Sequence, residues 1–139
     1  MTTCIPLLYL PKGNYDLTTS NDLVTDGTAA FNTEKITHAA VDITFTSLNG
    51  GTAPTCTIFL ERQGLDGNWY QVFSTGALNS GPQTISVDVS PALNGSVSGP
   101  LTSTVQHNVF TKTARLRWAF GGTTPPTSVT FSASIVGRD

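Results

Sequence analysis

The chain has 139 residues, of which 12% are charged, and its formal net charge at pH 7 is −2. This length suits one domain with its own hydrophobic core. The weak negative charge gives no long-range attraction to phosphates, which argues against nucleic-acid binding. No apolar run is long enough to span a bilayer, and the first residues lack the basic start and apolar stretch of a secretory signal. We therefore expect a protein made in the cytosol, with neither nucleic acid nor membrane as a partner.

Residues 1–19 carry two prolines and show no steady hydrophobic period. They are predicted to form an extended N-terminal arm, and residues 20–139 are predicted to form a single domain. An arm this apolar is not expected to extend freely into water. It should either lie over its own domain or dock on a neighbouring subunit. Its predicted partner-binding residues are Ile5, Leu7, Leu8, Tyr9 and Leu10.

Hydrophobic alternation predicts a series of β-strands from residue 36 onward. Val41, Ile43 and Phe45 alternate with polar residues, as in a half-buried strand. No window combines a helical period with capping residues, so little helix is expected. Further strands are predicted at residues 22–31, 56–60, 69–74, 85–89, 101–105, 116–120 and 129–135. The strand at 101–105 lies in the long Gly-, Pro-, Ser- and Thr-rich segment 90–113.

Two similar turns interrupt this pattern. Residues 50–59 read GGTAPTCTIF, and residues 121–131 read GGTTPPTSVTF. Glycine supplies positive φ, the prolines oppose helix, and the β-branched flanks favour strands. Each turn is predicted to close a β-hairpin, and Thr123 is a predicted partner contact at the second tip. A third hairpin is predicted at Asp66-Gly67.

Seven to nine antiparallel strands in a chain of this size predict an all-β fold. The expected architecture is an antiparallel two-sheet β-sandwich. A jelly roll is the expected version of that sandwich. The extended N-terminal arm would precede it.

The chain offers few groups for catalysis. A hydrolase needs a nucleophile within reach of a base, and the only histidines are His38 and His107, with no G-x-S-x-G elbow around any serine. Glu34 and Glu61 are the only glutamates. The turn at Asp66 matches only the beginning of a calcium loop. The sequence therefore predicts no enzyme, no catalytic residue, no metal and no cofactor.

The two cysteines, Cys4 and Cys56, are expected to be free thiols. A single pair in a reducing compartment seldom forms a disulfide. A zinc site would need more ligands at closer spacing.

Two arginines are predicted to share the outer face of one strand. Arg115 and Arg117 could grip a partner's carboxylates through bidentate hydrogen bonds, or they could keep the sheet soluble and prevent edge pairing. Phe59 breaks the alternation of its strand by placing a ring on the outer face. Trp69, Tyr70 and Phe59 could stack on sugar rings, but alternation places only one of Trp69 and Tyr70 on each face. Core packing is predicted for Trp69.

Residues 60–70, LERQGLDGNWY, resemble the strand–turn–strand signature "LEGS-x-DG-x-NWY" of many small structural proteins of tailed bacteriophages. Residues 114–118, ARLRW, followed by GGT and a final alternating strand, resemble the ending of the same proteins. The resemblance covers about residues 41–137 and departs at Arg62-Gln63, where the pattern has Gly-Ser. It implies a virion component with a β-sandwich fold and no enzymatic role.

Within that class, the chain most resembles capsid decoration (cement) proteins, which are small, often trimeric sandwiches that clamp neighbouring major capsid protein subunits. The resemblance implies the major capsid protein and further copies of the chain, as a homotrimer, as partners. It implies location in the virion, assembled in the host cytoplasm. Tail, baseplate and fibre components can look alike in sequence. A carbohydrate-binding (receptor-binding) sandwich is the alternative from another class, and it would take a glycan as partner.

Overall fold

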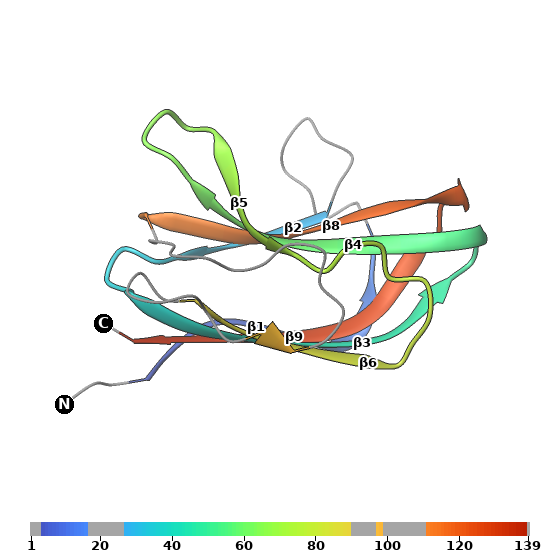
Figure 1. Cartoon of the computed structure of the whole chain (residues 1–139), viewed down its shortest axis with the longest axis horizontal. Coiled ribbons are helices and arrows are strands. Elements are labelled where there is room, and N and C mark those ends of the chain that lie inside the picture. The colour runs from blue at the N-terminus through green and yellow to red at the C-terminus, as the bar shows by residue number, and fades with distance from the viewer. Residues whose placement is uncertain (1–3, 17–26, 90–96, 99–110, 139) are drawn as a thin grey trace.

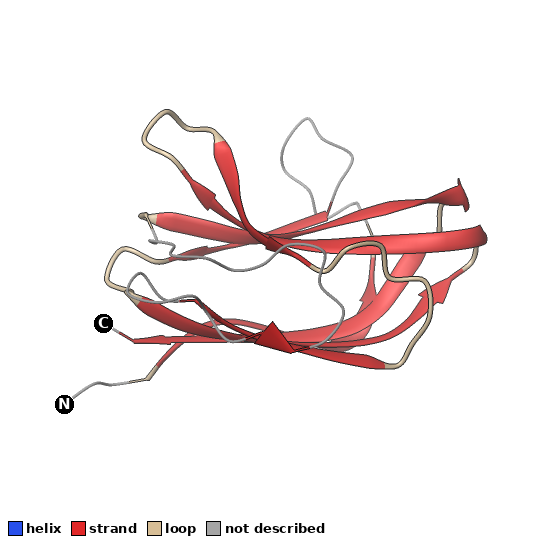
Figure 2. Ribbon diagram, in the orientation of Figure 1, coloured by secondary structure: helices blue, strands red, loops and turns tan. Residues whose placement is uncertain are grey.

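The computed structural model describes residues 4–16, 27–89, 97–98 and 111–138. All secondary-structure elements assigned in these ranges are β-strands (Figure 2). The strands are β1 (Ile5–Tyr15), β2 (Gly27–Asn32), β3 (His38–Asn49), β4 (Thr52–Gln63), β5 (Trp69–Ser74), β6 (Gln83–Val89), β7 (Val97–Ser98), β8 (Thr113–Thr124) and β9 (Ser128–Arg138).

The strands form two antiparallel sheets that lie face to face (Figure 1). One sheet has the order β1-β9-β3-β6-β7, and the other has the order β2-β8-β4-β5. If the two-residue β7 is set aside, the remaining eight strands have the connectivity of a jelly roll. The predicted all-β, two-sheet antiparallel sandwich is confirmed.

The core lies between the two sheets and is filled by alternate residues of each strand. Val41, Ile43 and Phe45 of β3 are fully buried, as their period predicted. They face buried residues of the other sheet, such as Ile58 and Leu60 of β4. Each such side chain contributes about 1.5–3 kcal/mol on burial, so these alternating positions hold the sheets together.

Trp118 is the largest side chain of the core, and the end of β1 covers it. Its ring packs edge-on against Phe131 and Tyr15, with ring centroids 5.5 and 5.8 Å away. Its Nε1 donates a hydrogen bond to the carbonyl of Asp16 at 2.9 Å. A side chain at Gly27 would begin 2.0 Å from the same nitrogen, so the indole fills the space that glycine leaves open.

The described part of the predicted arm is an edge strand of the sandwich. β1 pairs with β9 along its whole length, from Ile5 opposite Gly137 to Tyr15 opposite Val129. Of the two alternatives predicted for this segment, packing on its own domain is the one observed. The pairing shifts register next to Pro6 and again around Pro11, which explains the absence of a steady period in the sequence. Proline is tolerated here because an edge strand has one unpaired side.

The two Gly-Gly turns are not hairpins, and this prediction is wrong. β3 and β4 belong to different sheets, as do β8 and β9, so each turn is a corner where the chain crosses from one sheet to the other. Gly51 and Gly122 have φ of +80° and +106°, and a Cβ at either would lie within 2.5 Å of a backbone oxygen. The glycines therefore allow the chain to cross sharply from one sheet to the other. The local sequence of such a crossing resembles that of a hairpin turn.

The other predicted strands differ from the structure mainly at their ends. The strand expected within 22–31 is β2, which begins at Gly27. The strand expected at 101–105 lies outside the described residues. In the segment 90–113, the short β7 pairs with β6. The Asp66-Gly67 hairpin is confirmed, because β4 and β5 pair on either side of it.

We predict that Gly27→Ala destabilises the fold by about 1–3 kcal/mol, because the new methyl group would overlap the Trp118 indole and overpack the core. Gly13→Ala is the matched control, since a Cβ there would meet its neighbours at an ordinary 3.7 Å. Urea denaturation of both variants measures the difference. Equal midpoints for the two variants would contradict this account of the Gly27 site.

Candidate functional site

The two corners lie side by side at one end of the sandwich. Because β3 pairs with β9 and β4 pairs with β8, Thr52 lies opposite Thr124 and Asn49 lies opposite Ser128. The Asn49 carbonyl accepts hydrogen bonds from the backbone N–H and the hydroxyl of Thr127, at 2.9 and 3.0 Å. We call residues 49–54 and 121–128 together the corner end. Its two halves brace each other, which makes it a rigid surface.

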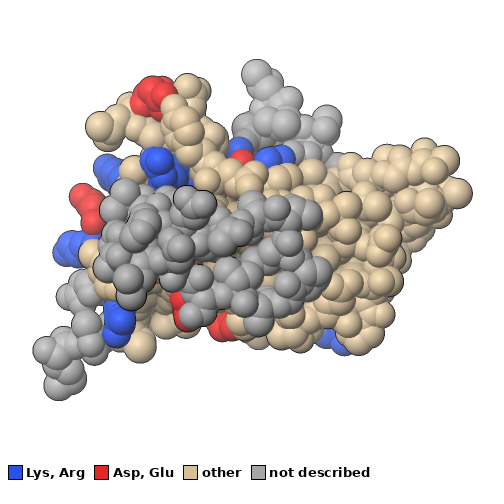
Figure 3. Space-filling model, in the orientation of Figure 1, with Lys and Arg blue, Asp and Glu red and all other residues tan. Residues whose placement is uncertain are grey.

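The corner end carries no charge. No Asp, Glu, Lys or Arg occurs in residues 46–60 or 118–137, and the β5–β6 connection is also uncharged. In Figure 3 this end, at the right, shows no coloured side chains, whereas the opposite end carries several. Thr123, a predicted contact residue, is exposed here together with its neighbours Thr124 and Pro125. Charged residues are depleted at the centres of protein–protein interfaces, so this surface is suited to contact a partner.

Arg115 and Arg117, the two arginines predicted as partner contacts, form ion pairs with Glu61 of the same chain. Glu61 Oε1 lies 2.8 Å from Arg115 Nε and 3.1 Å from Arg117 Nε. Glu61 Oε2 accepts a further hydrogen bond from Arg117 Nη2 at 3.1 Å. The strand register brings them together, because Glu61 lies directly opposite Arg115 in the β4–β8 pair. Glu61 and Arg115 are only 6% and 7% exposed. Each arginine thus has an internal partner, and Arg115 offers little surface for contact with another protein.

Aromatic rings complete this charged cluster on the outer face of the four-stranded sheet. The Arg115 guanidinium lies 4.2 Å from the centre of the Trp69 ring, and that of Arg117 lies 4.0 Å from the centre of Phe59. Such cation–π contacts favour guanidinium over ammonium groups. The prediction of core packing for Trp69 is wrong, because this side chain is half-buried beside Arg115. Phe59 lies on the outer face, as its break in the alternation predicted.

The arm has five apolar residues that were predicted to bind a partner. Most of these side chains instead pack against other parts of the same chain. Leu7, Leu8 and Leu10 are half-buried against the core. Tyr9 is 70% exposed, so among these five it is the one available to a partner. Ile5 is half-buried and lines a pocket.

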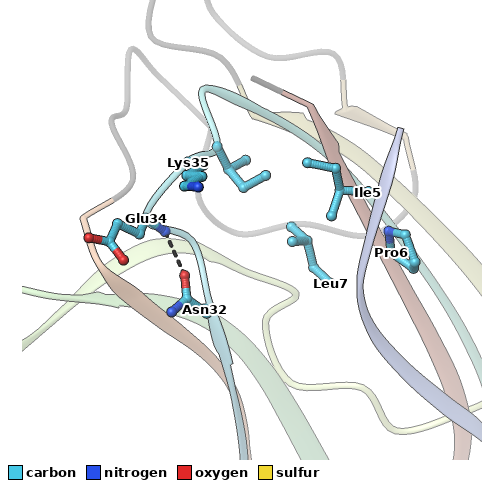
Figure 4. A pocket seen from close by; sticks show the side chains of 7 residues that line it. Ile5, Pro6, Leu7, Asn32, Glu34 and Lys35 are labelled. Carbon is cyan, nitrogen blue, oxygen red and sulfur yellow. Dashed lines mark hydrogen bonds between the residues drawn. The ribbon is translucent and has the colours of Figure 1, made fainter. Parts of the chain in front are cut away.

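That pocket lies between the start of β1 and the β2–β3 connection and has a volume of about 440 Å³. Figure 4 shows Ile5 and Leu7 pointing from β1 toward the connection, with Glu34 and Lys35 on the other side. The Glu34 N–H donates to the side-chain oxygen of Asn32 at 2.9 Å, which holds the connection in place. Alternation did not indicate this pocket, because it depends on contact between distant segments.

The β4–β5 hairpin ends in a well-ordered polar turn. The Asp66 carboxylate accepts hydrogen bonds from the Asn68 N–H at 2.9 Å and from the Tyr70 hydroxyl at 2.5 Å. These bonds lower the pKa of Asp66, with the Tyr70 bond the largest cause, and the same contact raises the pKa of Tyr70. Asp66 thus organises a turn.

The other titratable candidates have ordinary structural surroundings. His38 Nδ1 lies 2.8 Å from the Thr37 hydroxyl, and His107 lies outside the described residues. Cys4 is exposed and Cys56 is buried, and both are free, as predicted. Burial raises the pKa of the Cys56 thiol to about 12. Within the described ranges, no group of three His, Cys, Asp or Glu side chains could hold a metal ion, and no helix could cross a membrane.

No protein-family model and no curated protein sequence matches the chain. Its fold is similar to that of a chain in the structure of the infectious bursal disease virus Gx strain, with a TM-score of 0.42 and 15% sequence identity. The similarity covers 99% of this chain and 32% of that chain. The present chain therefore spans about a third of the length of that viral chain.

We predict that Glu61→Gln destabilises the protein by about 3–5 kcal/mol, because two arginines would lose the carboxylate that compensates their charge at a largely buried site. Glu34→Gln is the control, since Glu34 is exposed and an exposed substitution changes stability by less than about 0.5 kcal/mol. Chemical denaturation measures both changes. A Glu61 variant as stable as the control would show that the cluster contributes nothing to folding.

We predict that the hairpin turn is most ordered between about pH 4 and pH 10, the ordinary values of its two groups. The pKa of Asp66 is lowered, so its stabilisation is present above the ordinary carboxylate pKa and is lost as pH falls through the depressed value. The pKa of Tyr70 is raised, so its contribution is present below the ordinary tyrosine pKa and is lost as pH rises through the elevated value. Amide exchange at Asn68 and the Tyr70 ring resonances measure both transitions.

Tyr70→Phe is the control for this pH dependence. It removes the alkaline transition and moves the acid transition toward the ordinary pKa of Asp, because the first cause of the Asp66 shift is lost. Identical profiles for this variant and the original chain would contradict the Asp66–Tyr70 coupling.

Proposed function

We propose that this chain is a non-enzymatic structural component of a virus particle, and that it acts as a capsid decoration (cement) protein on a tailed bacteriophage. The observation that carries the proposal is the uncharged corner end, where two paired crossings present exposed threonine and proline side chains. The resemblance of residues 60–70 and 114–137 to phage structural proteins supports the same class. Jelly rolls serve in capsid and lectin domains alike, so the fold alone does not select a function.

The corner end suits a protein that must bind in many copies. Glycines permit each crossing, and hydrogen bonds between Thr127 and Asn49 join the two corners, which limits the conformational freedom that is lost on binding. Its lack of charge avoids the desolvation of ionic groups at the contact. Many copies of a modest contact would together stabilise a lattice of major capsid protein.

The β1 strand has a different role in this proposal from that of a free docking arm. Its pairing with β9 makes it part of the fold. Tyr9 is the exposed large hydrophobic residue on it. The corner end, and Thr123 in particular, is therefore the proposed capsid contact.

Purification of the particles that contain this protein, followed by localisation of its density by cryo-electron microscopy, tests the proposal. Density on the outside of the head supports a decoration protein. Density on the tail, baseplate or a fibre overturns that role and selects the alternative virion component.

We predict that Thr123→Asp lowers the occupancy of the protein on purified heads at least tenfold, because a desolvated carboxylate would be introduced into the contact. Thr37→Asp is the matched control, since Thr37 is also exposed but lies in the β2–β3 connection. Gel densitometry of heads incubated with each protein measures occupancy. Equal occupancy for the two variants would exclude the corner end as the contact surface.

A glycan-binding module is the second candidate, and it rests on Tyr70. This ring is 42% exposed, with Arg62 lying 5.3 Å from its centre, whereas Trp69 lies against Arg115. Binding on a glycan array that is lost in Tyr70→Ala would favour this candidate over the decoration role.

A further inference from the structure

The β4–β5 hairpin projects from the four-stranded sheet (Figure 1) and presents a single leucine at its turn. Leu65 has a relative exposure of 105%, the highest of the large apolar residues that are exposed in the described ranges. We call residues 64–68 the finger tip. One exposed apolar residue is common on protein surfaces, so its meaning depends on how rigidly it is held and on what could receive it.

Hydrogen bonds within the β4–β5 turn support the finger tip. The Gly64 N–H donates to the Asn68 carbonyl at 2.7 Å, and the Gly67 N–H donates to the Gly64 carbonyl at 3.0 Å. The Gln63 side chain adds a bond to the Gly67 carbonyl at 3.1 Å. Together with the Asp66 bonds, these contacts fix the backbone that carries Leu65. An apolar group fixed in this way loses less entropy on binding than one on a mobile loop.

A receiving site of matching chemistry lies at the opposite edge of the same molecule. The pocket of about 440 Å³ between β1 and the β2–β3 connection, which we call the Ile36 pocket, is lined by the apolar side chains of Ile5, Leu7 and Ile36. β1 and β2 are edge strands of their sheets, and β5 is the edge strand farthest from β2. The finger tip therefore projects from one edge of the sandwich while the pocket opens at the other.

Charges flank both features and are complementary. Arg62 and Asp66 lie beside Leu65 on the hairpin, and Glu34 and Lys35 lie at the pocket. The hairpin and the pocket thus each offer one acidic and one basic group. An inserted leucine can therefore be flanked by two ion pairs, each between a group of the hairpin and a group of the pocket. Such rim contacts set the orientation of a complex more than its strength.

We propose that Leu65 of one copy of this chain inserts into the Ile36 pocket of a second copy. The contact joins different surfaces of the two copies, so it repeats head to tail and closes into a ring or continues as a filament. It requires no other protein. The proposal is independent of the capsid contact at the corner end.

Sedimentation equilibrium of the full chain over a range of concentrations tests this association. The mass should rise above 14.6 kDa with concentration, and Leu65→Asp should raise the dissociation constant at least tenfold. Ala77→Asp is the matched control, because it also replaces an exposed apolar residue but lies in the β5–β6 connection, outside the finger tip and the pocket; it should associate like the original chain. A mass of 14.6 kDa up to about 1 mM, a concentration at which weak contacts of about 4 kcal/mol are half formed, overturns the proposal. An equal effect of both substitutions also overturns it.

A disulfide test locates the contact directly. Cys4 is exposed and precedes the pocket residue Ile5, so a Leu65→Cys variant should form an intermolecular disulfide with Cys4 on mild oxidation. This bond requires the two Cα atoms to come within about 7 Å. Mass spectrometry of the cross-linked peptides identifies the pair, and Ala77→Cys is the control that should not form it. Formation of the Cys4 disulfide to an equal extent in both variants, or in neither, contradicts the proposed insertion.

Discussion

The pairing of β3 with β9 and of β4 with β8 is the constraint on which the rest of the structure depends. Each pair lies in one sheet, and the chain passes between the sheets at two corners, so the corners must lie next to each other. Gly51 and Gly122 permit this crossing where other residues would overlap the backbone. The repeated Gly-Gly-Thr motif in the sequence is thus a consequence of the fold's two layers. The same pairing also brings Glu61 beside Arg115 and Arg117 on the outer face.

The sheets of this protein have outer faces of different character. On the four-stranded sheet, a carboxylate, two guanidinium groups and two aromatic rings pack into a nearly closed cluster. On the five-stranded sheet, residues such as Thr44, Thr84 and Ser132 form cross-strand rows of small hydroxyl side chains. A carboxylate needs partners once it is buried, whereas hydroxyls remain satisfied by water. The buried carboxylate Glu61 therefore lies where strand register pairs it with two arginines.

Much of the fold could be predicted from local sequence, because the two-residue period depends only on neighbours along the chain. The core positions of β3 were found in this way, and the turn at Asp66 was found from its Asp-Gly pair. The assignment of strands to sheets could not be predicted from local sequence, because it depends on partners such as Glu61 and Arg115, which are 54 residues apart. Trp69 was wrongly predicted to face the core, because the β4–β5 pairing shifts register between Leu60 and Glu61 and leaves one extra residue in β5. An extra residue reverses the face of the sheet on which the side chains before it lie. The Ile36 pocket escaped prediction for the same reason as the sheet assignment.

The pairing of the first strand with the last has a consequence for how this protein folds. Ile5 finds its partner only when Gly137 is available, and β9, which lies between β1 and β3 in the sheet, joins the first strand to the rest of that sheet. Contacts this distant in sequence are slow to form, because the loop entropy is lost before the contact is gained. During synthesis, the apolar side chains of β1 remain without their neighbouring strand until β9 has left the ribosome. Nascent chains are therefore exposed to aggregation through this segment, and its two prolines and Lys12 disfavour pairing between unfinished copies.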